Sequence, residues 1–98
     1  MTLKVVFRPV ARDEFVEAAA RYEGQRTGLG AKFIAEVERC VRSAAEHPEL
    51  YQAIYKGVRR VAAKRFPYCV YFRPEREAIV ILAVFHGSRE PAQWQQRA

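Results

Sequence analysis

The sequence predicts one α+β domain spanning residues 1–98. An N-terminal strand and an antiparallel helical hairpin precede a three-stranded antiparallel β meander, which forms one small sheet packed on the helices. Three observations predict it. Apolar residues recur at helical spacing in the first half of the chain. Short β-rich runs separated by turn residues fill most of the second half. A length of 98 residues, half of them hydrophobic, allows one modest core.

The first elements are a strand and a helix. Leu3 to Phe7 is rich in β-forming residues and ends before Pro9, which predicts a short strand. From Val10 the period changes, and the apolar residues fall at i, i+4, i+7 and i+11 on one face of a helix that ends near Gly24. These residues are Ala11, Phe15, Ala18 and Tyr22. Asp13 and Glu14 are expected in its first turn, where the helix dipole favours acids.

A second helix is expected from Leu29 to His47, because Pro48 stops it. The turn before it contains Gly28 and Gly30, so the two helices should form an antiparallel hairpin. The apolar stripe of this helix consists of Phe33, Val37, Cys40, Val41 and Ala44.

Three strands are expected to follow. The first runs from Val58 to Phe66, and the second from Tyr68 to Phe72 after Pro67. The third, Ala78 to His86, is apolar on both faces (Val80, Leu82 and Val84 against Ile79, Ile81 and Phe85), which predicts a central strand. Its apolar run is far shorter than the roughly 20 residues of a membrane span. Residues 89–98 are expected to form a short tail with one or two helical turns.

The net charge of +6 lies entirely in residues 50–98, since residues 1–49 hold eight basic and eight acidic side chains. This asymmetry predicts an anionic partner, whether nucleic acid, an acidic peptide or an acidic protein surface; the alternative is a solvated basic face. Cys40 and Cys69 are expected as reduced core residues. Together with His47 and His86 they lack metal-ligand spacing, so we expect no metal site and no cofactor.

The basic residues of the second half are interleaved with aromatic ones, and this pattern has two interpretations. Arginine offers bidentate contacts to phosphate or carboxylate, and rings can stack on bases. The alternative is ordinary packing, with Tyr68, Tyr71 and Phe72 as cross-strand pairs and Trp94 as an anchor for the tail.

Two segments carry a family resemblance. Arg59-Arg60-Val61, Arg65-Phe66-Pro67-Tyr68 and the following strand resemble the RelE/ParE superfamily of type II toxins, as do His86-Gly87-Ser88-Arg89-Glu90-Pro91 and Trp94. The likeness spans nearly the whole chain, and its Phe-Pro-Tyr and His-Gly-Ser-Arg-Glu-Pro features are most similar to the ParE branch. It implies the same order of one strand, two helices and three strands that the periodicity predicts.

The resemblance leaves three functions open. A ParE-like toxin inhibits DNA gyrase, a RelE-like toxin cuts mRNA on the ribosome without a metal, and a third reading is an inactive or repurposed basic module. The positions near the RelE catalytic tyrosine hold Gln93, Trp94 and Gln95, none of which is a general base, so the gyrase inhibitor is favoured. For a ribonuclease, the resemblance implies Arg65, His86 and Arg89 as catalytic residues. The residues predicted to bind the target belong to the basic and aromatic pattern described above, and they are Arg59, Arg60, Arg65, Tyr68, Arg89 and Trp94.

The resemblance also implies a partner, a cognate small ParD-like antitoxin whose C-terminal segment wraps the toxin. The residues expected to bind it are Phe15, Tyr22, Phe33 and Val37 on the helical hairpin. Operator DNA is expected to be bound only through the antitoxin, and the toxin is expected in the cytoplasm.

Overall fold

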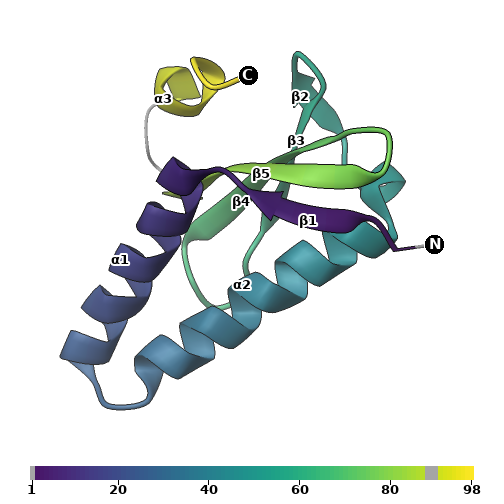
Figure 1. The fold of residues 1–98 in the computed structure, drawn as a ribbon. Helices are drawn as coiled ribbons and strands as arrows, with labels where there is room; N and C mark the ends of the chain where they lie inside the picture. The colour runs from purple at the N-terminus through teal and green to yellow at the C-terminus, as the bar shows by residue number, and fades with distance from the viewer. Residues whose placement is uncertain (1, 88–90) are drawn as a thin grey trace.

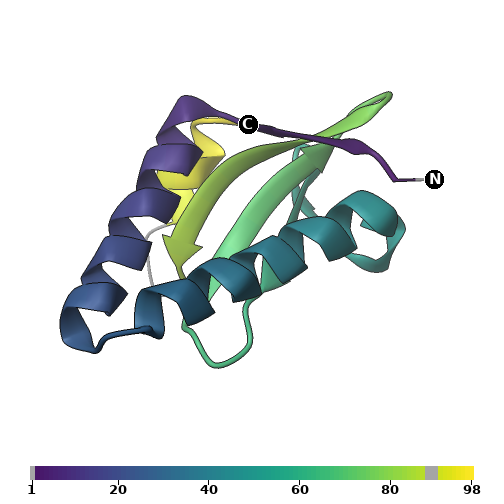
Figure 2. The same ribbon diagram turned by 60° about the horizontal axis from the view of Figure 1, so that its bottom comes forward.

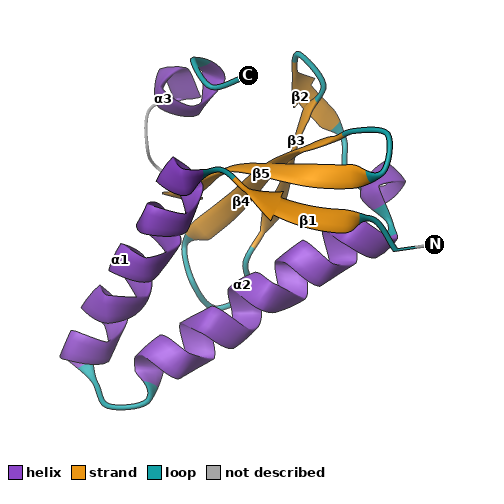
Figure 3. Ribbon diagram, viewed as in Figure 1, coloured by secondary structure: helices purple, strands orange, loops and turns teal. Residues whose placement is uncertain are grey.

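The computed structural model describes residues 2–87 and 91–98, which fold into helices on both sides of one sheet (Figure 1). Figure 3 distinguishes the helices from the strands. In chain order the elements are β1 (Lys4–Phe7), α1 (Pro9–Gln25), α2 (Leu29–Glu46), the 3-10 turn η1 (Pro48–Leu50), β2 (Ala53–Tyr55), β3 (Val58–Ala62), β4 (Tyr68–Pro74), β5 (Ala78–His86) and α3 (Pro91–Gln95).

The sheet has five strands in the order β1-β5-β4-β3-β2. The strands β3, β4 and β5 form the predicted antiparallel meander. β1 pairs in parallel with β5, with Lys4 opposite Ala78, so β5 is an interior strand buried on both faces, as predicted, although the central strand of the five is β4. β1 is therefore an edge strand, while β2 forms the opposite edge.

The two faces of the sheet are covered by different helices. The α1–α2 hairpin covers one face, and Figure 2 shows α2 running across the strands. This layer buries Phe33, Val37, Phe72 and Ile81 with no exposed surface. α3 lies against the opposite face, where Trp94 joins a smaller cluster that includes Tyr71, Leu82 and Phe85 (Figure 1).

Two glycines and a glutamate stabilise the turn and the close packing of the helical hairpin. A Cβ atom added to Gly30 would lie 2.8 Å from the carbonyl oxygen of Ala19, so only glycine allows the helices to approach this closely. Gly28 has a φ of 90°, in the left-handed region. The Glu23 carboxylate accepts hydrogen bonds from the backbone N–H groups of Gly28 and Gly30, which caps the start of α2 from the end of α1.

Several predicted boundaries are wrong for physical reasons. α1 begins at Pro9, whose fixed φ suits the first turn, so Asp13 and Glu14 lie beyond that turn. β3 ends at Ala62 instead of Phe66, because residues 63–67 form a loop in which Arg65 has a φ of 70°.

The sequence analysis also missed strand β2. Lys56 and Gly57 both have a positive φ, 48° and 79°, as in the two-residue turns that match the twist of a hairpin. This turn pairs Ala53–Tyr55 with β3, and three residues are too few to show a period of two.

A β-bulge corrects the predicted faces of β5. Tyr71 lies opposite Ala83 while Phe72 lies opposite Ile81, so Leu82 is an additional residue in β5. Strict alternation placed Val84 with Leu82 and Phe85 with Ile81, but the bulge exchanges them, so Val84 faces the helical hairpin with Ile81 and Phe85 faces α3 with Leu82. At the bulge, Ile81 therefore packs against the helical hairpin and Leu82 packs on the α3 side of the sheet.

Candidate binding surfaces

The C-terminal segment is held against β5 by Arg97. Its guanidinium donates to both carboxylate oxygens of Glu14, at 3.0 and 2.8 Å, and to the carbonyl oxygen of Leu82 at 3.0 Å. The same group lies 4.8 Å from the ring centroid of Phe85. Glu14 in turn accepts from the backbone N–H of Val84 at 3.1 Å. Glu14 and Arg97 thus bond the edge of β5 at Leu82 and Val84, beyond Ile81, where its pairing with β1 ends.

Trp94 anchors the same segment on the sheet, as one interpretation of the sequence expected. Its side chain is only 4% exposed. Its ring stacks on Tyr71, with centroids 4.7 Å apart, and lies edge-on to Tyr55 at 6.0 Å. Trp94 is therefore part of the core on this face and offers little surface to a target.

The predicted target-binding arginines of β3 point to opposite faces of the sheet. Arg60 lies opposite Tyr71, on the α3 side, and is exposed. Arg59 lies opposite Phe72, on the helical side, where its guanidinium donates to the carbonyl oxygens of Pro48 and Tyr51 at 2.8 and 3.1 Å. Arg59 is thus used to hold the segment between α2 and β2.

Tyr68 and His86 meet at the end of the sheet near the α1–α2 turn. They are opposite each other in β4 and β5, with ring centroids 5.6 Å apart, and Tyr68 is 8% exposed. Arg21 of α1 donates to the Tyr68 hydroxyl. These three residues line a small cavity of about 50 Å³ together with Glu14, Glu17 and Val84. Arg21 was not predicted as a site residue, because its side chain lies on the polar side of α1. Arg89, which was predicted, lies outside the described residues.

The β3–β4 loop is fixed to α2 by Glu36. Its carboxylate receives two hydrogen bonds from Arg39, at 2.8 and 2.7 Å, and one from the backbone N–H of Lys64. The hydrogen bonds from Arg39 are the main cause that lowers the pKa of Glu36 from 4.5 to about 2. The Lys64 bond adds to this effect, whereas burial of the carboxylate opposes it. The charged form of Glu36 therefore positions a loop that carries two basic residues, Lys64 and Arg65.

Phe66, in the same loop, packs on the helical hairpin. Its ring lies edge-on to Tyr22 and Phe33, at centroid distances of 5.0 and 5.2 Å. Tyr22 is half-buried by these contacts, and Phe33 is fully buried. Both residues were expected to bind an antitoxin, and the structure uses them to seat this loop.

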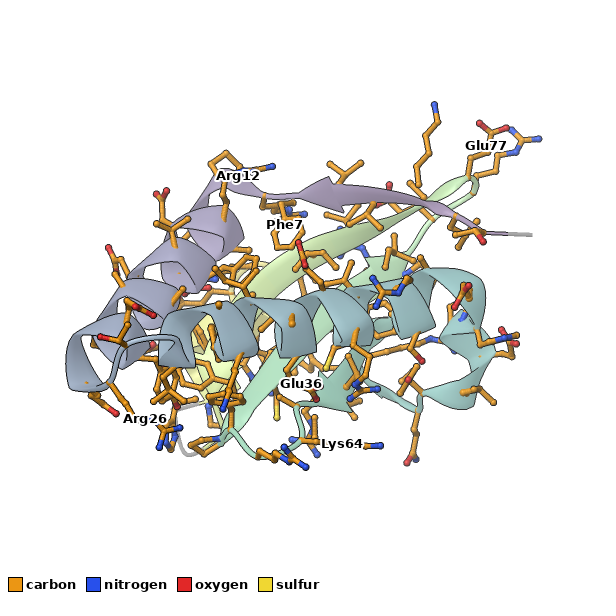
Figure 4. All side chains as sticks on the ribbon, turned by 90° about the horizontal axis from the view of Figure 1, so that it is seen from below. Phe7, Arg12, Arg26, Glu36, Lys64 and Glu77 are labelled. Atoms are coloured by element: carbon orange, nitrogen blue, oxygen red, sulfur yellow. The ribbon has the colours of Figure 1, made fainter. Side chains whose placement is uncertain are left out.

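An apolar groove lies between β1 and α2. Its volume is about 490 Å³, and its apolar lining includes Val5, Phe7, Phe15, Val37 and Val41. Figure 4 shows Phe7 and Arg12 where the groove meets the start of α1. Phe15 also lines a shallower hollow of about 170 Å³ on the hairpin with Val16, Ala19 and Ile34.

Of the predicted antitoxin-binding residues, Phe15 is the one that reaches both hollows, while Val37 has no exposed surface and forms only the floor of the groove. The sequence analysis missed Val5, Val16 and Ile34, which are 40%, 61% and 39% exposed. The sequence feature that could have identified these three residues is that they are apolar but lie outside the regular apolar stripes of their elements.

The two cysteines are free and buried, as expected. Burial raises the pKa of the Cys40 thiol to about 11, which leaves it protonated at neutral pH. No helix in the described part of the chain has both the length and the hydropathy that crossing a membrane requires.

Comparison with known proteins identifies relatives of this fold. The profile of a family described as "ParE toxin of type II toxin-antitoxin system, parDE" matches residues 5–91. Among solved structures, a chain of the "Chromosomal ParDE TA system from P. aeruginosa" superposes with a TM-score of 0.72. The match covers 87% of this chain and 96% of the other at 17% identity, so it supports the fold alone. No curated protein matches the sequence.

Proposed function

Because the chain belongs to the ParE toxin family of type II toxin–antitoxin systems, we propose that it acts in the cytoplasm as a stoichiometric inhibitor of DNA gyrase. The observation that carries this proposal is the family match over residues 5–91, which confirms the resemblance seen in the sequence. Of the target-binding residues expected from the sequence, Arg60 and Arg65 have exposed side chains and remain candidates for contact with the target.

We also infer that a cognate ParD-like antitoxin neutralises the toxin by covering the groove between β1 and α2 and the hollow on the hairpin. Val16 and Ile34 give this surface exposed apolar area that a partner helix would bury. β1 is an edge strand and borders the groove, so an extended segment of the partner has a strand to pair with.

A second candidate function is a metal-independent endoribonuclease on the ribosome. The contact of His86 with Tyr68, whose hydroxyl is bonded by Arg21, favours it because a base and a cation lie together at one cavity. The purified chain should nevertheless block gyrase supercoiling at a molar ratio near one and leave mRNA on programmed ribosomes intact.

Two histidine variants decide between the functions. The variant His86→Ala should inhibit gyrase like the wild type, and His47→Ala, at the exposed end of α2, serves as its control. Codon-positioned mRNA cuts that disappear in His86→Ala but persist in His47→Ala would replace the gyrase proposal with the ribonuclease.

Two exposed apolar residues test the antitoxin surface. Val16→Glu places a charge in the hollow on α1, whereas Leu50→Glu makes the same kind of change on η1, where the side chain is 68% exposed. We expect Val16→Glu to weaken antitoxin binding at least tenfold and leave gyrase inhibition unchanged, and Leu50→Glu to alter neither. Equal antitoxin affinity for the two variants, measured by titration calorimetry, would place the antitoxin elsewhere.

A further inference from the structure

We propose that one end of the molecule binds the phosphates of duplex DNA and, as an extension of the proposed function, contacts the DNA segment that gyrase holds. This basic end consists of Arg21, Arg26, Lys32, Lys64 and Arg65. The residues come from α1, the α1–α2 turn, the first turns of α2 and the β3–β4 loop. Figure 4 shows Arg26 and Lys64 on the same side of the molecule.

The basic end is built on rigid contacts. The loop with Lys64 and Arg65 is held by the Glu36 carboxylate at one side and by the Phe66 ring against Tyr22 at the other. Lys32 lies one helical turn before Glu36, on the side of α2 that faces this loop. The charges are therefore presented by fixed backbone, which lowers the entropy lost on binding.

The five cations of the basic end are not held in ion pairs within the described part of the chain. Of the two nearby acids, Glu36 is paired with Arg39, whereas Glu23 accepts only from backbone N–H groups and keeps one negative charge at the turn. Glu17 lies beside Arg21 at the small cavity, so Arg21 contributes the least of the five.

The chemistry of this surface favours a duplex over a single strand. Proteins bind single-stranded nucleic acid by stacking bases on exposed aromatic rings. All twelve aromatic side chains of the sequence are described, and every one of them is buried or half-buried. Contacts to phosphate remain, and these carry no sequence information, in keeping with the expectation that operator DNA is recognised through the antitoxin.

The shape of the basic end also favours DNA over an acidic protein as its ligand. Of the three hollows described above, only the small cavity beside Tyr68 includes a residue of the basic end, Arg21, so we ascribe binding at the basic end to charge. Duplex DNA offers about one negative charge per 1.7 Å of its axis, so several residues of the basic end can each reach a phosphate.

The test measures binding of the folded toxin to a labelled 30-base-pair duplex of arbitrary sequence by fluorescence anisotropy, between 20 and 200 mM salt. Four phosphate contacts predict a slope of log K against log salt of about −4. The variants Arg26→Gln/Lys32→Gln and Lys64→Gln/Arg65→Gln should each reduce its magnitude by about 2. The control, Arg42→Gln/Arg76→Gln, removes the same charge from exposed positions elsewhere and should leave the slope unchanged.

The outcomes separate this inference from the proposed function. An equal loss of slope in the control would show that net charge alone binds DNA, and tighter binding to oligo(dT) than to the duplex would also overturn the inference. If both basic-end variants lose DNA binding yet inhibit gyrase as well as the wild type, the contact with gyrase-held DNA is wrong. A wild-type chain that binds the duplex at the basic end but does not inhibit gyrase would refute the gyrase proposal and leave the DNA surface intact.

Discussion

Replacing Glu36 with glutamine removes the negative charge that joins α2 to the β3–β4 loop while keeping the size of the side chain. The carboxylate is 13% exposed and receives hydrogen bonds from Arg39 and from the backbone of Lys64. Its pKa falls from 4.5 to about 2, which corresponds to at most about 3–4 kcal/mol, since one pKa unit equals about 1.4 kcal/mol. Arg39 is 38% exposed, and solvent screening reduces this contribution, so we expect Glu36→Gln to lower the free energy of unfolding by about 1–2 kcal/mol at pH 7.

The effect should depend on pH in a defined direction. The unfolded chain binds a proton at Glu36 near pH 4.5, whereas the folded chain binds it only near pH 2. The stabilisation by Glu36 is therefore fully present above about pH 5 and is lost as the pH falls toward 2. The difference between the wild type and Glu36→Gln should shrink across this window.

Urea denaturation followed by circular dichroism at pH 7, 5, 4 and 3 measures this difference. The matched control is Glu38→Gln, on the same helix and without an ion pair in the described chain, and it should change stability by less than about 0.5 kcal/mol. The ionised Glu36 carboxylate does not stabilise the fold if Glu36→Gln loses as much stability at pH 3 as at pH 7. The same conclusion follows if Glu36→Gln loses no more stability at pH 7 than Glu38→Gln does.

Three further predictions test the hairpin, the C-terminal segment and the core. Gly30→Ala should destabilise the protein by about 1–3 kcal/mol because its Cβ meets backbone, whereas Gly24→Ala meets nothing within 4 Å and should not; thermal melts of both variants compare them. Arg97→Gln should loosen the C-terminal segment and shift the fluorescence of Trp94, the one tryptophan, to longer wavelength; an unshifted spectrum would show that Trp94 and the Arg8 bond to the carbonyl oxygen of residue 97 hold the segment without the Arg97 side chain. In a Cys69→Ser variant, buried Cys40 should react with a thiol reagent in urea but not in buffer, and rapid reaction of that folded variant would contradict its burial.

Long periodic patterns made the hairpin and the antiparallel meander predictable. The apolar stripe of α2 and the two apolar faces of β5 are repeated often enough to be recognised. β2 and the bulge at Leu82 were not predictable, because one depends on a two-residue turn and the other on the register with β4. The parallel position of β1 beside β5 depends on packing across the whole chain.

The candidate surfaces were predicted less well, because residue type does not reveal which side of a strand or helix is exposed. Phe33 was chosen for its place in an apolar stripe, and the strongest members of such a stripe become core. Arg59 and Arg60 are identical in type and adjacent, yet the pleat directs one to the helical side and the other to the α3 side. Arg21 became a candidate only when the fold brought α1 to Tyr68.

The parallel pairing of β1 with β5 has a consequence for the synthesis of the toxin. β1 and the helical hairpin leave the ribosome first, but Lys4 pairs with Ala78, so β1 has no neighbouring strand until β5 has been made. Contacts this distant in sequence form late and slowly in folding. Until then the sheet-facing side of the hairpin is uncovered and prone to aggregation or proteolysis. An antitoxin that recognises the groove beside β1 therefore captures the toxin only after most of the chain has been translated.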